Sequence, residues 1–246
     1  MNVGKRRLLN DDFVRRSFRD VADQDYILAR MAFRSGLNLQ VITLSHQAIE
    51  RYLKAILLFN DLSVKAIEHD IVKGLAAVRN EISFVREIPV AVDEFVSLLN
   101  RQASRYFEWS FGVSGRTILA LDMSVWHIRR YCEDMHRLQR TADGTVREEI
   151  VVGEWLHSPD WSRKPHRFRH STGFLEKVLD GEESLDLRRH LILRNAYYGR
   201  RRNIDHRSFG RFAGANPTLT LHPEAFAHFD RLVKFSRAFR RRHAGA

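Results

Sequence analysis

The chain has 246 residues, 44% of them apolar, which is enough for one large domain or for one domain with an appendage. It holds no run of about 18 apolar residues, so no membrane span is expected, and the basic N-terminus lacks the apolar core of a signal peptide. The single cysteine, Cys132, excludes a disulfide framework within one chain and a cysteine-based zinc site, and favours a reducing, cytoplasmic location.

The formal net charge is +11 at pH 7, and it is unevenly distributed. Residues 1–140 carry 21 basic and 17 acidic side chains, whereas residues 141–246 carry 20 and 13. The concentration of positive charge in the shorter C-terminal part suits a polyanion such as RNA or DNA. Arginine greatly outnumbers lysine, so a compositional bias of the genome is an alternative source of the excess.

The first half of the chain is predicted to form consecutive helices. Apolar residues recur every three or four positions, and Asp, Gly and Pro mark the breaks between segments. These signals predict a loose basic arm over 1–9, a helix over 11–34 with a break near 23–25, a central helix from Asn38 to about 59–61, shorter helices over 67–80 and 90–102, and a long helix over 116–140.

Composition changes after a polar linker over 141–149. A loop rich in Pro, Trp, Arg and His is followed by predicted helices over 173–181, 184–198 and 223–242. No clean alternation of apolar and polar residues indicates strands. The predicted fold is therefore all-α: an antiparallel up-and-down bundle over 10–140 and a basic, mainly helical C-terminal extension over 150–246.

The central helix carries a polar stripe on an otherwise apolar surface. Gln47, Glu50 and Lys54 fall at i, i+3 and i+7, so they project from one face. Polar groups in such a helix must pair with each other or face a groove. The three residues are candidates for binding a nucleotide or phosphate; the alternative is a structural cluster in which Glu50 and Lys54 pair and fix the helix register.

The first half of the chain resembles the HEPN domain (higher eukaryotes and prokaryotes nucleotide-binding) over about residues 20–135. The resemblance is carried mainly by Gln-Ala-Ile-Glu-Arg-Tyr-Leu-Lys-Ala at 47–55, and is supported by segments 25–30, 69–71, 98–100, 104–106 and 128–131. It implies a helical bundle that commonly forms a homodimer. Many members are metal-independent ribonucleases, often toxins or defence factors, and others are noncatalytic partners of nucleotidyltransferases. The resemblance thus implies RNA or a nucleotide as a ligand, and an antitoxin or a nucleotidyltransferase as a possible protein partner. No membrane association, metal or cofactor is expected.

Catalytic HEPN members carry an arginine followed, after four to six residues, by a histidine. The arginine neutralises the scissile phosphate and the histidine transfers protons during attack by a 2′-hydroxyl. We choose Arg130 and His136 as the catalytic candidates because they lie in the predicted last bundle helix. The same spacing also occurs at Arg129 with His136, Arg163 with His170, Arg200 or Arg201 with His206, and Arg237 with His243.

Two further groups are candidates for binding RNA. Arg101, Arg105 and Tyr106 precede a glycine-containing loop in which aromatic and charged residues alternate, and such residues stack bases and hold phosphates. The basic run Arg200, Arg201 and Arg202 is the second group; a solvated face is the alternative. Two hypotheses follow: a nucleic-acid- or nucleotide-associated binding module, within a toxin–antitoxin or defence system, or a metal-independent endoribonuclease.

Overall fold

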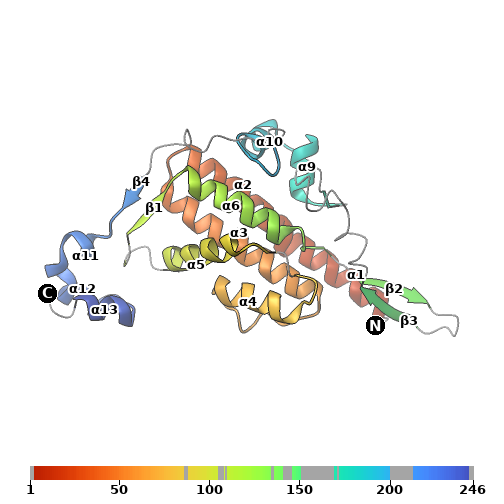
Figure 1. Ribbon diagram of the computed structural model, residues 1–246, viewed down its shortest axis with the longest axis horizontal. Coiled ribbons are helices and arrows are strands. Elements are labelled where there is room, and N and C mark those ends of the chain that lie inside the picture. The colour runs from red at the N-terminus through yellow and green to blue at the C-terminus, as the bar shows by residue number, and fades with distance from the viewer. Residues whose placement is uncertain are drawn as a thin grey trace.

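The structure is a computed structural model, and its architecture is mostly helical (Figure 1). It describes residues 3–85, 88–104, 108, 110–133, 136–140, 146–150, 169–170, 172–199 and 213–243. The predicted all-α class is confirmed.

A bundle of long helices forms the body of the molecule. In chain order its helical elements are α1 (Val3–Val14), the π-helical η1 (Arg15–Arg19), α2 (Asp20–Arg34), α3 (Asn38–Phe59), α4 (Ile71–Glu81), α5 (Val90–Ser104) and α6 (Gly115–Arg129). Helices α2, α3 and α6 run side by side, with α4 and α5 packed on the other side of α3 (Figure 1). The central position of α3 explains its sequence, because a helix apolar nearly all round must be covered on most sides.

The bundle core continues into the C-terminal half of the chain. Side chains of α9 (Phe174–Asp180) and α10 (Leu185–Ile192) are buried in the same apolar cluster as α2, α3 and α6; they include Leu175, Val178, Leu191 and, after α10, Tyr198. The α9–α10 segment (residues 172–199) therefore packs as part of the bundle.

The end of the chain forms a small lobe with a separate core. The C-terminal lobe (residues 213–243) contains β4 (Ala213–Ala215), α11 (Thr218–Leu221), the 3-10 turn η4 (Pro223–Ala225), α12 (Phe226–Phe229) and α13 (Arg237–His243). Its core is built from Leu219, Phe235 and Phe239. Strand β4 pairs antiparallel with β1 (Phe111–Val113). Glu108 accepts hydrogen bonds from the backbone nitrogen (2.7 Å) and hydroxyl (2.6 Å) of Ser236. The lobe is therefore attached to the segment that connects α5 to α6.

The N-terminal predictions are wrong in two places. The expected loose arm over 1–9 is helical from residue 3, within α1. The expected break at 23–25 is absent from α2, because Asp23 and Asp25 do not cap a helix: they pair with Arg129 and Arg51. The irregularity lies earlier, in η1, where the helix widens to π geometry.

The predicted helix over 116–140 is too long. Helix α6 ends at Arg129, where the amides of Tyr131 and Cys132 bond to carbonyls three residues back. Residues that follow form β2 (His136–Arg140), antiparallel to β3 (Val146–Ile150), so the expected linker over 141–149 includes part of a strand. Asp143-Gly144, between the two strands in sequence, is a hairpin signal that helical periodicity obscured.

The predicted helix over 223–242 is also wrong, because the lobe breaks it into η4, α12 and α13. Phe235 must turn inward to complete the small core, and Ser236 bonds to Glu108, which a continuous helix would prevent. Helix α10 ends at Ile192, earlier than the expected 198. Among the described residues no helix is both long and apolar enough to cross a membrane.

Candidate functional site

The polar stripe of α3 is the centre of a small cluster near the surface. The Glu50 side chain, only 11% exposed, accepts a hydrogen bond from Lys54 Nζ (2.6 Å), and His69 Nδ1 lies 3.1 Å from the same Oε1 atom. His46, one turn earlier on α3, places Nδ1 3.8 Å from Glu50 Oε2. Gln47 is half-buried on the same helix. Thus the predicted pairing of Glu50 with Lys54 is present, and two histidines join it.

Helices α4 and α5 complete this group. Asp70 caps α4 by accepting bonds from the backbone nitrogens of Val72 and Lys73, both at 3.1 Å. Asn100 on α5 donates to Asp70 Oδ1 (3.2 Å), and its own Oδ1 lies 3.4 Å from His46 Nε2. We name His46, Gln47, Glu50, Lys54, His69, Asp70 and Asn100 the α3 cluster.

Burial lowers the pKa of His46, so this imidazole is neutral at pH 7. The amide nitrogen of Asn100 faces Asp70, which directs its carbonyl oxygen at His46. We therefore assign the proton of His46 to Nε2, which donates to Asn100. Neutral His46 leaves Glu50 and Lys54 as the charged centre of the cluster.

His69 is the exposed member of the cluster. Its side chain is 87% exposed although Nδ1 contacts buried Glu50. The preceding residue, Glu68, has a φ of 51°, a left-handed conformation that is uncommon outside glycine. The loop therefore holds His69 over α3, with one ring nitrogen towards Glu50.

The remaining sequence candidates fall in different places. Arg101 is exposed near the end of α5. Arg105, Tyr106, Arg200, Arg201 and Arg202 lie outside the described residues. Arg130 follows α6, is 3% exposed, and its guanidinium carbon lies 5.2 Å from the ring centre of Tyr131. His136 is not on that helix but at the start of β2, so the helical placement expected for the pair is wrong; the side chain of His136 is not among those described.

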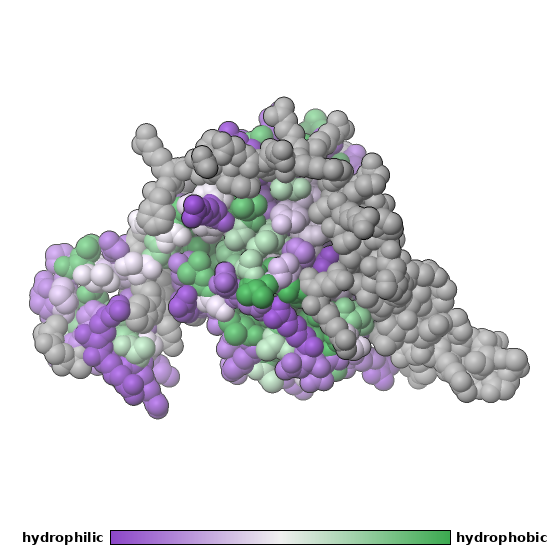
Figure 2. All heavy atoms as spheres, viewed as in Figure 1, coloured by the Kyte–Doolittle hydropathy of each residue, from purple (hydrophilic) through white to green (hydrophobic). Residues whose placement is uncertain are grey.

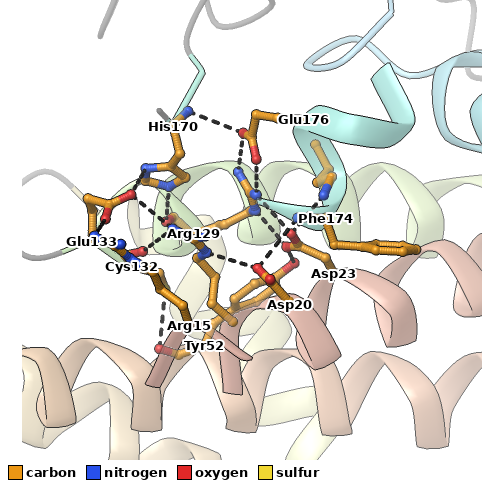
Figure 3. A network of polar contacts seen from close by, with 12 residues as sticks. Arg15, Asp20, Asp23, Tyr52, Arg129, Cys132, Glu133, His170, Phe174 and Glu176 are labelled. Atoms are coloured by element: carbon orange, nitrogen blue, oxygen red, sulfur yellow. Dashed lines mark hydrogen bonds and ion pairs between the residues drawn. The ribbon is translucent and has the colours of Figure 1, made fainter. Parts of the chain in front are cut away.

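A second polar group is buried inside the bundle, and its centre is Arg129 (Figure 3). The Arg129 guanidinium donates to both carboxylate oxygens of Asp23 (2.6 and 2.8 Å) and to both of Glu176 (2.8 and 2.6 Å). Asp23 belongs to α2 and Glu176 to α9, and Arg129 is 1% exposed. Two bidentate pairs use four of the five N–H groups of one guanidinium.

Other residues extend this Arg129 network. Asp23 also accepts from Tyr52 Oη (2.7 Å) and from the backbone nitrogen of Leu175 (3.0 Å). His170 Nε2 lies 3.0 Å from the carbonyl oxygen of Arg129, and Glu133 binds Arg19 (2.9 Å). The start of α9 leaves no room for a side chain at Gly173, because a Cβ there would clash with Oε2 of Glu176.

The charges in this network are fixed by burial and pairing. Burial raises the pKa of Glu176, but the charge and hydrogen bonds of Arg129 outweigh it and lower the pKa to about 2. Burial, followed by the charge of Arg129, lowers the pKa of His170 to about 3, so His170 is neutral and donates from Nε2. Burial raises the pKa of the Cys132 thiol, which makes it a poor nucleophile.

A third group joins α2, α6 and the residues after α10. Tyr26 Oη donates to Asp122 (2.6 Å) and accepts from Asn195 Nδ2 (2.7 Å). Arg30 pairs with Asp122 and donates to the carbonyl oxygens of His190 (3.0 Å) and Leu193 (2.6 Å). Both buried groups thus attach the α9–α10 segment to the bundle, whereas the α3 cluster faces solvent through His69.

Sequence reasoning missed the Arg129 network as a unit. The arginine–histidine spacing relates Arg129 only to His136, and His170 only to Arg163, which lies outside the described residues. In the structure Arg129 and His170 contact each other across 41 positions. Within the described parts of the chain, no group of three or more His, Cys, Asp or Glu side chains is arranged to hold a metal ion.

The comparisons with known proteins agree with the bundle. The family model of the HEPN domain matches residues 16–111, a range that contains every residue of the α3 cluster and excludes Arg129, Arg130 and His136. Neither a curated protein nor a solved structure matches the chain. HEPN domains as a class are nucleotide-binding or ribonuclease-type modules. Residues 16–111 of this chain are thus similar to the HEPN domain family.

Proposed function

We propose that this protein is a nucleic-acid- or nucleotide-binding HEPN module and that the α3 cluster is its binding site. The observation that carries the proposal is a contrast between the Arg129 network and the α3 cluster in how far their polar groups are already enclosed by partners. The Arg129 guanidinium is enclosed by two carboxylates, whereas the α3 cluster presents His69 to solvent, 87% exposed, beside Lys54. A ligand can reach the α3 cluster without breaking a buried ion pair.

The chemistry of the cluster favours a base or ribose edge over a bare phosphate. Glu50 offsets Lys54, and Lys73 lies 3.9 Å from Asp70, so the local charges largely cancel. Amide, imidazole and carboxylate groups supply both donors and acceptors, which suits hydrogen bonding to nucleotide edges. The net charge of +11 supplies the general attraction to phosphates.

The test is equilibrium binding by the full chain, with EDTA present. The probes are fluorescein-labelled oligouridylate and oligoadenylate of about 15 nucleotides, followed by anisotropy, and mononucleotides, followed by calorimetry. We expect Gln47→Leu to weaken binding about tenfold, because it leaves a polar edge of the ligand without a partner.

Gln40→Leu is the matched control. Gln40 is exposed on the same helix, two turns before Gln47, so the same substitution there leaves binding unchanged. Absence of binding to every probe at protein concentrations of about 100 µM would refute the proposal, because even non-specific polyanion binders associate in that range.

A second candidate function is metal-independent RNA cleavage, and one observation favours it. Glu50 orients His69 through Nδ1, which leaves Nε2 at the solvent-facing side of the ring to exchange protons with a 2′-hydroxyl. Loss of cleavage in His69→Ala would assign the reaction to this residue. Loss in His136→Ala would instead support Arg130 and His136, the pair chosen from the sequence. Intact RNA would leave a binding module.

A further inference from the structure

The C-terminal lobe contains a cavity of about 600 Å³ outside the HEPN match. Its walls are mainly apolar, from Leu219, Phe229, Val233 and Phe235, and Asn216 and Thr218 add polar groups. Phe229 is 37% and Val233 39% exposed, so these walls are open to solvent. The packing of the lobe's own core leaves this apolar surface without a cover from the described residues of the lobe.

The segment that contributes Phe229, Val233 and Phe235 to the cavity also carries positive charge. Residues 213–243 contain six Arg and Lys side chains and two acidic ones. Three exposed cations, Arg231, Lys234 and Arg237, alternate in sequence with the cavity residues Phe229, Val233 and Phe235. Asp230 is already paired with Arg240 (2.9 Å). Figure 2 shows strongly hydrophilic residues beside apolar ones on this lobe. The occupant that complements such a surface is an anion with an apolar face.

Contacts within the lobe and to the bundle hold this surface in place. Phe235 and Phe239 stack with ring centres 5.2 Å apart, and Phe239 stacks on His243 at 4.1 Å. The β1–β4 pairing and the two bonds from Ser236 to Glu108 fix the lobe to the bundle. The cavity wall therefore does not have to form on binding, which lowers the entropic cost of association.

We infer that the C-terminal lobe binds a single-stranded polynucleotide, with a base in the cavity against Phe229 and its phosphates on Arg231, Lys234 and Arg237. A base offers a π-face for the aromatic wall and an edge for Asn216 and Thr218, and the strand places anions at regular intervals. An acidic peptide could satisfy the charges and the two polar groups, but it carries no base to stack against Phe229. The inference rests on the proposed nucleic-acid binding and adds a second contact surface to it.

The experiment uses the full chain and the labelled oligouridylate of about 15 nucleotides, with an oligothymidylate of equal length as the DNA arm. Phe229→Ala is expected to weaken binding about tenfold with an unchanged salt dependence, and Phe229→Trp to preserve the affinity because stacking remains possible. Binding of both probes would assign the site to single strands in general. Binding of the RNA alone would assign it to the ribose form.

The charge contribution is measured separately. Replacing Arg231, Lys234 and Arg237 with alanine should reduce the slope of log K against log salt by about two. The matched control removes three exposed cations elsewhere, Arg16, Lys177 and Arg189, and should change the slope far less. Circular dichroism and the melting temperature verify folding of each variant.

The outcomes separate this inference from the proposed function. If the chain binds the probe but Phe229→Ala and the triple variant behave like wild type, the inference is refuted and the proposed function stands. If Gln47→Leu has no effect while Phe229→Ala abolishes binding, the lobe alone binds and the α3 assignment fails. If neither probe binds, the inference and the proposed function both fail. If an acidic apolar peptide binds in a Phe229-dependent way and does not compete with the nucleic acid, the cavity is a peptide site and the polynucleotide is refuted as its occupant.

Discussion

The Arg129 network and the α3 cluster use the same kinds of side chain in opposite ways. Both combine a cation, carboxylates and histidine. In the Arg129 network the cation is 1% exposed and donates to two carboxylates, so its hydrogen-bonding capacity is nearly used. In the α3 cluster the Glu50 side chain is 11% exposed, while His69, which contacts it, is 87% exposed. The difference teaches that residue type alone does not separate a buried structural group from the group that we propose as a binding site, whereas burial and the number of hydrogen bonds already made do.

The largest effect that tests this comparison is on stability. Arg129→Met should lower the free energy of unfolding by about 3–5 kcal/mol, because Asp23 and Glu176 would remain buried without their cation. Urea denaturation measures this change. Arg16→Met is the control: the Arg16 side chain is 77% exposed and paired with Asp12, and its removal should cost less than about 1 kcal/mol. Similar losses in the two variants would contradict a structural role specific to Arg129.

The second effect is acid destabilisation. The pKa of His170 is lowered to about 3 in the folded state, below the value of about 6.5 of an unfolded chain, so only the unfolded state gains a proton in between. Stability from this group is complete above about pH 6.5 and falls by about 1.4 kcal/mol per pH unit as the pH drops towards 3.

His127 adds to this slope down to about pH 4, because burial and then Arg130 lower its pKa. His170→Asn removes one of the groups whose pKa is lowered by folding, so its profile of unfolding free energy against pH, from denaturation at stepped pH, should be less steep. A profile parallel to that of the wild type would show that His170 is not protonated selectively in the unfolded state.

The third effect concerns the attachment of the α9–α10 segment. Tyr26→Phe should cost about 1–3 kcal/mol, because Asp122 and Asn195 both lose a buried hydrogen bond. Tyr197→Phe is the matched control: Tyr197 is half-buried and stacks on Trp126 with ring centres 6.2 Å apart, a contact that phenylalanine retains. Its change should stay within about 0.5 kcal/mol in thermal or urea denaturation. Equal losses of unfolding free energy in the two variants would contradict a specific contribution from the hydrogen bonds of Tyr26.

The smallest effect on stability is expected at the α3 cluster. His69→Ala should alter the free energy of unfolding by less than about 0.5 kcal/mol, because the side chain is almost fully exposed. The same variant should weaken binding of the oligonucleotide probes. Parallel measurements of denaturation and anisotropy test the division; a large loss of stability would move the α3 cluster into the structural class.

Sequence periodicity by itself determined most of the bundle. The extent of α3 follows from its apolar surface and the start of α5 from Pro89, whereas α4 begins at Ile71, after the capping Asp70, and not at the predicted residue 67. The pairing of Glu50 with Lys54 was also predictable, because residues four apart on a helix are neighbours whatever the fold. The HEPN resemblance followed from this local pattern and is confirmed by the family match.

Only the tertiary structure decided which charged residues meet across the chain. Arg129 contacts Asp23 and Glu176 over separations of 106 and 47 residues, and no local pattern encodes such pairings. The C-terminal end of α6, the hairpin of β2 with β3 and the broken helices of the lobe likewise depend on partners distant in sequence. Local propensities act over a few residues, whereas burial and pairing depend on the whole packed chain. The sequence therefore indicated the helices, and the tertiary structure decided which charged side chains on them are buried and paired.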